Sequence, residues 1–189
     1  MYKELNLSEQ TYLLNIARQS LESAVRGNPL PEINLDQLPD SLSEIGASFV
    51  TLTINNQLRG CIGAIDAYQP LAMDVQEHAI AAGLNDFRFP KVTVRELPLI
   101  KIEVSVLTPR SRVNYEQPQD LTFKIKPFVD GVILQDGIHK ATFLPQVWEK
   151  LPQPEEFLSH LCMKMGASGD IWRKKLLDVF VYQVQDFQE

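Results

Sequence analysis

The order of the predicted elements constrains the fold of this chain most, because the same plan occurs twice. Residues 49–54 alternate apolar and polar side chains, Asn55-Asn56-Gln57 is typical of a turn, and residues 58–65 return as the second strand of a hairpin. A second hairpin is predicted from Val132 to Leu144, around the turn Asp136-Gly137. Each hairpin is followed by a helical segment and then by one more strand.

Helix signals fill the remaining long segments. The first helix is predicted after an N-cap at Ser8 and ends at Gly27. Helices are also predicted over residues 71–84 and 155–165, each opened by a proline that fits the first turn. Residues 28–45 are rich in Pro, Asn, Asp and Ser, which indicates a long surface loop.

The last strands of the two copies are predicted at residues 100–107 and 176–187, and the spacing of Thr93 and Glu96 favours a short helix before Leu97. Hairpins and short connections favour antiparallel pairing, so the predicted class is α+β. We expect an internal duplication of hairpin, helices and strand that forms one mainly antiparallel sheet flanked by helices.

Composition limits the size, location and partners of the protein. With 189 residues, 44% hydrophobic, the chain predicts a single domain over 1–189, or two lobes at about 1–110 and 111–189. No apolar run approaches the roughly 20 residues of a membrane span, and the N-terminus does not resemble a signal peptide. Two isolated cysteines favour free thiols in the cytoplasm, and a net charge of -6 makes nucleic acid an unlikely partner.

The hexapeptide Leu58-Arg59-Gly60-Cys61-Ile62-Gly63 contains the first candidate site. In an extended strand Arg59, Cys61 and Gly63 face one way, and Gly60 leaves a gap on the core side for a helix to approach. One interpretation makes Cys61 a catalytic nucleophile, with Arg59 as an anion clamp and Gly63 leaving space beside the thiol. The alternative is a cysteine that packs as a small hydrophobic residue.

Asp86 and Arg88 form a second candidate site, just after the helix over residues 71–84. The planar guanidinium of Arg88 could bind a carboxylate or phosphate of a small anionic ligand. It could equally pair with Asp86 or Glu103 inside the fold, because arginines that are buried need a partner.

Glu103 and Ser105 alternate with the apolar residues of the strand over 100–107. If this strand pairs beside residues 58–65, Glu103 and Ser105 would share one face with Arg59 and Cys61. That face would then combine a cation, a thiol, a carboxylate and a hydroxyl.

Motifs for bound metals and cofactors are missing from the sequence. The two cysteines and His78, His139 and His160 show no metal-ligand spacing, so we expect no metal site. His78 follows Glu77 on a helix, which favours a solvated face. Phosphate-loop, dinucleotide and nucleophile-elbow motifs are also missing, so no cofactor is predicted.

The motifs together resemble one family over nearly the whole chain. Leu58 to Gly63, followed by Asp86-Phe87-Arg88-Phe89-Pro90 and then Ile102 to Leu107, is similar to the AMMECR family. Gly131 to Leu134 and Thr142 to Trp148 resemble its prokaryotic branch, that of the AmmeMemoRadiSam system. The resemblance implies a compact α+β fold with an internal duplication. It also implies two partners, a Memo-like protein related to metal-dependent extradiol dioxygenases and a radical S-adenosylmethionine (SAM) enzyme.

Two classes of function follow from these residues. In the first, the chain is a component of the modification pathway that the resemblance implies. It would bind a ligand or a protein partner through Arg59, Gly60, Gly63, Asp86, Arg88, Glu103 and Ser105. In the second, it is an enzyme that uses Cys61 as nucleophile on a small anionic or nucleotide-like substrate. The cluster motif of a radical enzyme and a multi-histidine iron site are missing, so the partners would supply those chemistries.

Overall fold

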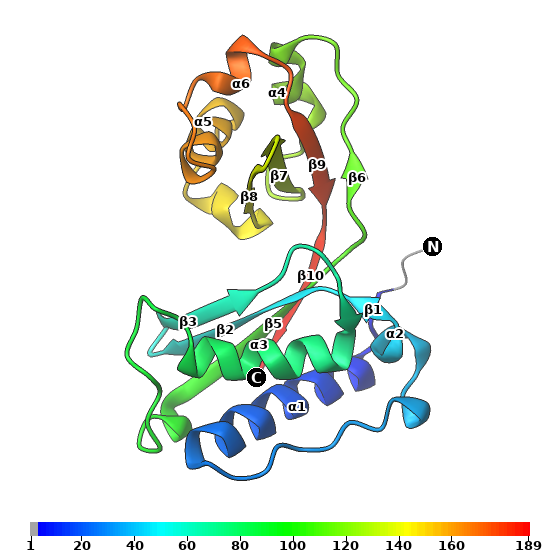
Figure 1. Cartoon of the computed structure of the whole chain (residues 1–189), viewed down its shortest axis with the longest axis vertical. Helices are drawn as coiled ribbons and strands as arrows, with labels where there is room; N and C mark the ends of the chain where they lie inside the picture. The colour runs from blue at the N-terminus through cyan, green and yellow to red at the C-terminus, as the bar shows by residue number, and fades with distance from the viewer. Residues whose placement is uncertain (1–3) are drawn as a thin grey trace. The chain divides into compact units, whose positions relative to one another are not determined.

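The chain forms two compact units, each with its own sheet (Figure 1). The computed structural model describes residues 4–189. Unit 1 consists of Met1–Leu107 and Gln185–Glu189, and unit 2 consists of Thr108–Val184. The α+β class is as predicted, but the expectation of one continuous sheet is wrong, because the two units have separate four-stranded sheets.

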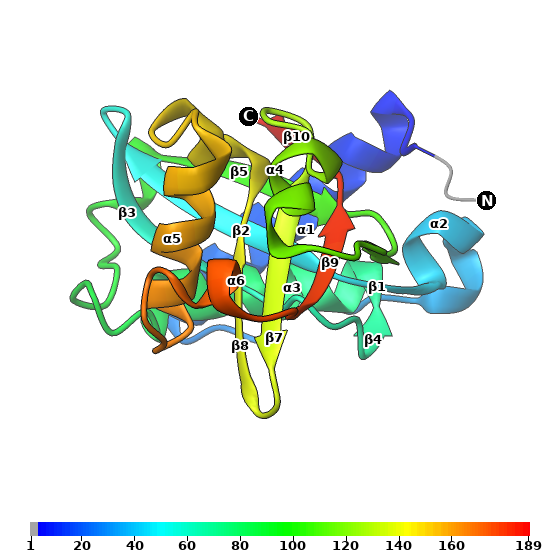
Figure 2. The ribbon, with the colours of Figure 1, turned by 90° about the horizontal axis from the view of Figure 1, so that it is seen from above.

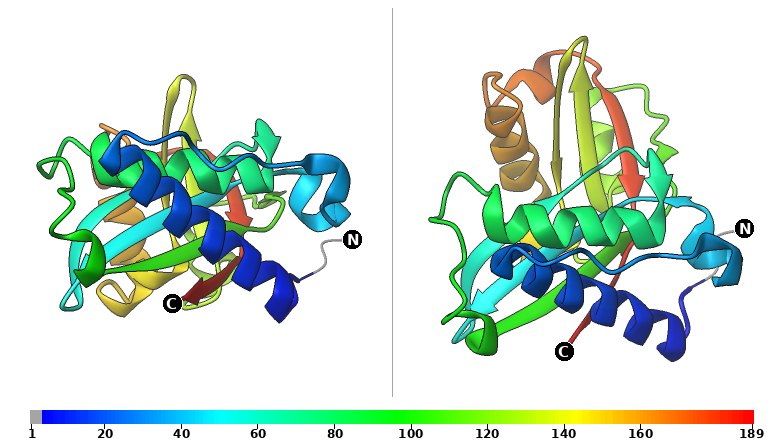
Figure 3. Two further views of the ribbon diagram at one scale, coloured as in Figure 1. Left: turned by 90° about the horizontal axis from the view of Figure 1, so that it is seen from below. Right: turned by 60° about the horizontal axis from the view of Figure 1, so that its bottom comes forward.

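The sheet of unit 1 has the strand order β10-β5-β2-β3, and β2 pairs antiparallel with both β3 and β5. A separate two-stranded sheet pairs β1 with β4. The strands are β1 (Ile45–Gly46), β2 (Ser48–Ile54), β3 (Gln57–Gly63), β4 (Gln69–Pro70), β5 (Ile100–Leu107) and β10 (Val184–Gln188). Helices α1 (Leu7–Arg26) and α3 (Leu71–Leu84) lie side by side over one face of the larger sheet (Figure 3).

The core of unit 1 lies between this sheet and the two helices. The alternating apolar residues Val50, Leu52, Ile102 and Val104 are fully buried on the helix side of the sheet. A Cβ atom built at Gly60 would overlap the backbone carbonyl oxygen of Ala82 in α3. The prediction that Gly60 admits a helix is therefore confirmed, and this close approach brings α3 against the strand that carries Cys61.

Helix α1 begins two residues earlier than predicted. Its N-cap is Asn6, not Ser8, because the Asn6 side chain accepts hydrogen bonds from the N–H groups of Ser8 and Glu9. The Glu9 carboxylate accepts a 2.7 Å hydrogen bond from the Asn6 N–H, which completes a capping box. Gly27 ends the helix in the left-handed conformation, as predicted.

Two connections differ from the sequence prediction. Residues 28–45 are not one long loop, because they include the short helices η1 (Leu35–Gln37) and α2 (Asp40–Ser43). Thr93 and Glu96 form a turn and not a helix, with the Glu96 carboxylate accepting from the backbone and side chain of Thr93. The turn leads into the short helix η2 (Leu97–Leu99).

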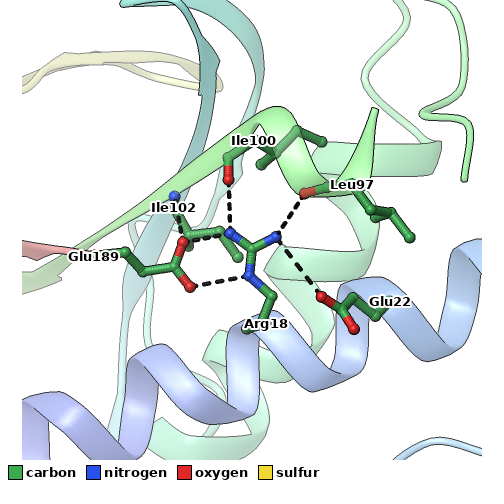
Figure 4. Close-up of polar contacts among 6 residues, drawn as sticks. All are labelled: Arg18, Glu22, Leu97, Ile100, Ile102 and Glu189. Carbon is green, nitrogen blue, oxygen red and sulfur yellow. Dashed lines mark hydrogen bonds and ion pairs between the residues drawn. The ribbon is translucent and has the colours of Figure 1, made fainter. Parts of the chain in front are cut away.

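Arg18 connects α1 with the start of β5 and with the segment after β10 (Figure 4). Its guanidinium donates to the carbonyl oxygens of Leu97 and Ile100, at 3.1 and 2.7 Å, and pairs with the carboxylate of Glu189. Glu189 also accepts from the N–H of Ile102 and donates its own N–H to the Ile102 carbonyl. This network holds the segment after β10 against β5 and α1.

Unit 2 has the strand order β6-β9-β7-β8, and β7 pairs antiparallel with both β8 and β9. Figure 2 shows β7 between β8 and β9. Trp148 stacks on Phe157 at 3.6 Å in its core. The elements are β6 (Ser111–Arg112), η3 (Pro118–Asp120), α4 (Leu121–Lys124), β7 (Gly131–Asp136), β8 (His139–Phe143), η4 (Pro145–Glu149), α5 (Pro154–Lys164), α6 (Ile171–Lys174) and β9 (Asp178–Tyr182).

The last strand predicted from the sequence, over 176–187, is wrong as a single element. The structure divides it into β9 and β10, which belong to different sheets. In both units the strand that follows the long helix pairs with the first strand of the hairpin, β5 with β2 and β9 with β7. An internal duplication stays a prediction.

Candidate functional site

The candidate site lies on β3, an edge strand whose one partner among residues 4–189 is β2. Cys61 is opposite Thr51, and Gly60 is opposite Leu52, but the next pair joins Leu58 to Thr53. Arg59 is therefore the additional residue of a β-bulge. A bulge interrupts the alternation of side chains, so the spacing of Arg59 and Cys61 no longer places them on one face as predicted.

Arg59 is bound inside the protein and not beside the thiol. Its Nε and Nη2 atoms donate to the two oxygens of Glu96, at 2.7 and 3.3 Å. The hydrogen bond from Arg59 lowers the pKa of Glu96 from 4.5 to about 2, although burial opposes the shift. Nη1 of Arg59 is buried and has no hydrogen-bond partner among residues 4–189. The role expected for Arg59, an anion clamp next to Cys61, does not match this placement.

Asp86 and Arg88 hold the backbone of Cys61 from the open side of the strand. Oδ2 of the buried Asp86 accepts the Cys61 N–H at 2.9 Å, and Nη2 of Arg88 donates to the Cys61 carbonyl oxygen at 3.0 Å. Arg88 also donates from Nε and Nη2 to the two oxygens of Asp86, at 2.9 and 2.6 Å. The pair thus occupies both backbone groups of Cys61 that β2 does not use.

Arg88 is the cation beside the thiol. The hydrogen bonds to the Asp86 carboxylate raise the pKa of Arg88 above its usual value, although burial opposes the shift. The Phe89 ring lies 5.6 Å from the guanidinium carbon. Pairing of Arg88 with Asp86 is confirmed, and the alternative pairing with Glu103 is wrong. The Arg88 side chain is still 46% exposed, so part of the guanidinium can reach a ligand.

The Cys61 side chain is half-buried and accepts a hydrogen bond from the Thr51 hydroxyl at 3.3 Å. Cys162, the other cysteine, is buried in the core of unit 2, where burial raises the pKa of its thiol. The two thiols therefore differ in both exposure and surroundings, and Cys61 is the accessible one.

Glu103 and Ser105 lie on the face of Cys61, but not next to it. β5 pairs with β2 and not with β3, so Thr51 separates Glu103 from Cys61 by two strand spacings, roughly 10 Å. Burial and the neighbouring Asp186 raise the pKa of Glu103. The expected patch of cation, thiol, carboxylate and hydroxyl is therefore not assembled as predicted.

Cys61, Thr51 and Glu103 form one row of paired residues across the sheet. Gly63, Phe49 and Ser105 form the neighbouring row on the same face, with Phe49 between the other two. A Cβ atom at Gly63 would overlap the ring of Phe49. The space beside Cys61 that Gly63 was expected to leave is therefore filled by an aromatic side chain. Ser105 is buried in this row and does not lie at the surface.

Sequence reasoning missed a buried polar cluster between β2 and α3. Oδ2 of Asp74 accepts from the hydroxyl of Ser48 at 2.6 Å and lies 3.1 Å from Nδ1 of His78. All three side chains are buried, so the solvated face predicted for His78 is wrong. Oδ1 of Asp74 has no hydrogen-bond partner among the described residues. The i, i+4 spacing of Asp74 and His78 was the signal that could have indicated this pair.

Within residues 4–189, no cluster of three or more His, Cys, Asp or Glu side chains has the arrangement of a metal site. No helix in the same range has both the length and the apolar character required to cross a bilayer.

The fold and the Cys61 site define an α+β protein whose edge strand presents a cysteine held by an aspartate–arginine pair. The sequence profile of the AMMECR1 family matches residues 14–187, and the chain belongs to this family. It is 34% identical to Protein MJ0810 of Methanocaldococcus jannaschii, over 98% of this chain and 92% of that protein. It is 38% identical to a protein of Methanothermobacter thermautotrophicus, over 100% of this chain and 98% of that protein.

The fold is also similar to a solved structure. The crystal structure of the uncharacterized protein PH0010 from Pyrococcus horikoshii has a TM-score of 0.87 and 33% sequence identity to this chain. The similarity covers 95% of this chain and 91% of PH0010.

Proposed function

We propose that this protein is a ligand-binding component that holds an anionic group beside Cys61. The observation that carries the proposal is the way Cys61 is fixed. Its backbone is bound by Asp86 and Arg88, while its thiol stays half-buried, with the Thr51 hydroxyl and the Arg88 guanidinium beside it. Asp86 compensates the charge of Arg88. Selectivity for an anionic group therefore comes from directed hydrogen bonds of Arg88 and not from a net positive field.

The resemblance to the prokaryotic branch supports a place in a modification pathway. In this proposal the chain contributes the binding site, and a Memo-like protein and a radical SAM enzyme supply the iron or radical chemistry. Two free cysteines support a reducing location, which we take to be the cytoplasm.

A second candidate function uses the same residues for catalysis. Cys61 would act as nucleophile on the anionic substrate, with Arg88 orienting its anionic group and Thr51 bonded to the sulfur. The thiol has no histidine base bonded to it within residues 4–189, which favours the binding role.

The two candidates can be tested with a pair of alkylating reagents of similar size. Iodoacetate carries a carboxylate and iodoacetamide does not, so the ratio of their rates at Cys61 reports anion binding. We expect this ratio to be several-fold higher in the native protein than in urea, and to fall in Arg88→Gln. Cys162 serves as the buried internal control. An unchanged ratio in a folded Arg88→Gln variant would disprove anion binding at this site.

The rate with neutral iodoacetamide separates the nucleophile from the binding residue. Labelling of Cys61 that is faster in the native protein than in urea would support catalysis, because the fold then activates the thiol. Labelling that is slower in the native protein supports the binding role alone.

A further inference from the structure

Phe87 is the most exposed aromatic residue beside the candidate site. It lies between Asp86 and Arg88, and 94% of its surface is accessible to solvent. Single exposed apolar side chains are common in proteins, so exposure by itself carries no argument. The position of Phe87 is informative, because both of its neighbours in the chain bind the backbone of Cys61.

The segment that carries Phe87 is a turn closed by hydrogen bonds. The Phe89 N–H donates to the Asp86 carbonyl at 3.1 Å, which closes the turn around Phe87 and Arg88. The Arg88 N–H donates to Oδ1 of Asp86, also at 3.1 Å. The same carboxylate binds β3, so the ring of Phe87 projects from a turn that is tied directly to the strand of Cys61.

Arg88 has donors left for a ligand. Its Nε and Nη2 atoms bind Asp86 and Cys61, while Nη1 has no hydrogen-bond partner among residues 4–189. Leu58, opposite Thr53 on the face of Cys61, is 45% exposed. The surroundings of the thiol thus combine one directed cationic donor with an apolar side chain, Leu58, on the same face of the strand.

We propose that the anionic ligand also carries an aromatic or flat apolar group, which packs on Phe87 while Arg88 binds its anionic end. This inference rests on the proposed function and narrows it to a class of ligand. Aromatic pairs add stabilisation beyond the burial of area, equivalent to a factor of about 3 to 10 in affinity. A ligand with a bare anionic group would lose this factor.

The probes are phenyl phosphate and methyl phosphate, which share an anionic group and differ in the aromatic ring. The measurement is the concentration of each that halves the rate of Cys61 alkylation by iodoacetamide, in the full chain. We expect phenyl phosphate to protect at a concentration about 3 to 10 times lower. Phe87→Ala should remove this preference. Phe123→Ala is the matched control, because Phe123 is 89% exposed in unit 2 and should leave the preference intact.

The outcomes separate this inference from the proposed function. Equal protection by both phosphates would overturn the inference that the ligand carries an aromatic or flat apolar group. It would still support anion binding at the site. A preference that survives in a folded Phe87→Ala variant also overturns it, because the aromatic contact then lies elsewhere. Protection by neither phosphate overturns both proposals.

Discussion

The carboxylate of Asp86 provides Cys61 with the hydrogen-bond partner that an edge strand lacks. Oδ2 of Asp86 accepts the Cys61 N–H at 2.9 Å, where a neighbouring strand would offer a carbonyl oxygen. Arg88 completes the substitution by donating to the Cys61 carbonyl. One ion pair therefore protects the edge of the sheet and positions the accessible thiol.

Replacing the buried Asp86 by asparagine should destabilise the protein by about 2 kcal/mol. An asparagine cannot accept from Cys61 and Arg88 with both of its polar atoms, because one of them is an amide donor. Urea unfolding measured at pH 7 gives the change in the free energy of unfolding.

The control for this variant is Asp178→Asn. Asp178 pairs with Arg112, but the two side chains are 47% and 63% exposed, so this exposed pair should contribute less than about 1 kcal/mol. Equal losses in the two variants would contradict the importance assigned to Asp86.

Acid should weaken unit 1 through Glu96 as well as through Asp86. Arg59 lowers the pKa of Glu96 in the folded state from 4.5 to about 2, and Arg88 holds the pKa of Asp86 far below its usual range. A lowered pKa in the folded state gives stabilisation that is complete above the unfolded pKa and is lost as the pH falls towards the folded value. Stability should therefore fall between about pH 4.5 and pH 2.

Glu96→Gln tests the contribution of this residue. The variant should be less stable than the wild type at pH 7 and should lose less stability between pH 5 and pH 2.5. The measurement is the urea midpoint as a function of pH. Parallel curves for the two proteins would show that the pair of Arg59 and Glu96 does not cause the acid sensitivity.

Gly60→Ala should destabilise unit 1 by roughly 3 kcal/mol, at the upper end of the range for overpacking. The new methyl group would overlap the backbone oxygen of Ala82, and backbone cannot move aside as a side chain can. Gly169→Ala is the comparison, because the nearest atom to its Cβ is 3.3 Å away, and its loss should be smaller than about 1 kcal/mol. Thermal unfolding of both variants provides the measurement.

Phe128→Gly should be more stable than Phe128→Ala by about 1 kcal/mol. Phe128 has φ 63°, in the left-handed region that favours glycine. Both variants lose the contacts of the same partly exposed side chain, but only Phe128→Ala keeps the unfavourable backbone conformation. Urea unfolding of the two variants gives the difference. A Phe128→Gly variant that is less stable than Phe128→Ala would argue against backbone strain at this position.

Local signals in the sequence were sufficient for much of unit 1. Strict alternation predicted β2 and β5, and the proline at position 70 marked the start of α3. Gly60 was correctly interpreted as a point of close approach, because glycine within a strand has few other physical reasons to be there.

The site itself depended on features that alternation cannot reveal. A bulge at Arg59 moved that side chain to Glu96, and the partner strand of β5 was β2 and not β3. Strand order is a long-range property, since it is decided by packing against α1 and α3 and not by residues within each strand. The sequence therefore singled out Cys61, Asp86 and Arg88, which the structure brings together, but it placed Arg59 beside the thiol where the structure places Arg88.

Unit 1 is discontinuous in the chain, with all of Thr108–Val184 inserted between β5 and its final segment. During synthesis the ribosome releases β5 long before Gln185–Glu189. Arg18 and the Ile102 backbone therefore lack their partner Glu189 until all of unit 2 has been made. The first unit to be made is thus the last to be completed, and β5 is an open edge for a chaperone or a neighbouring nascent chain until that moment.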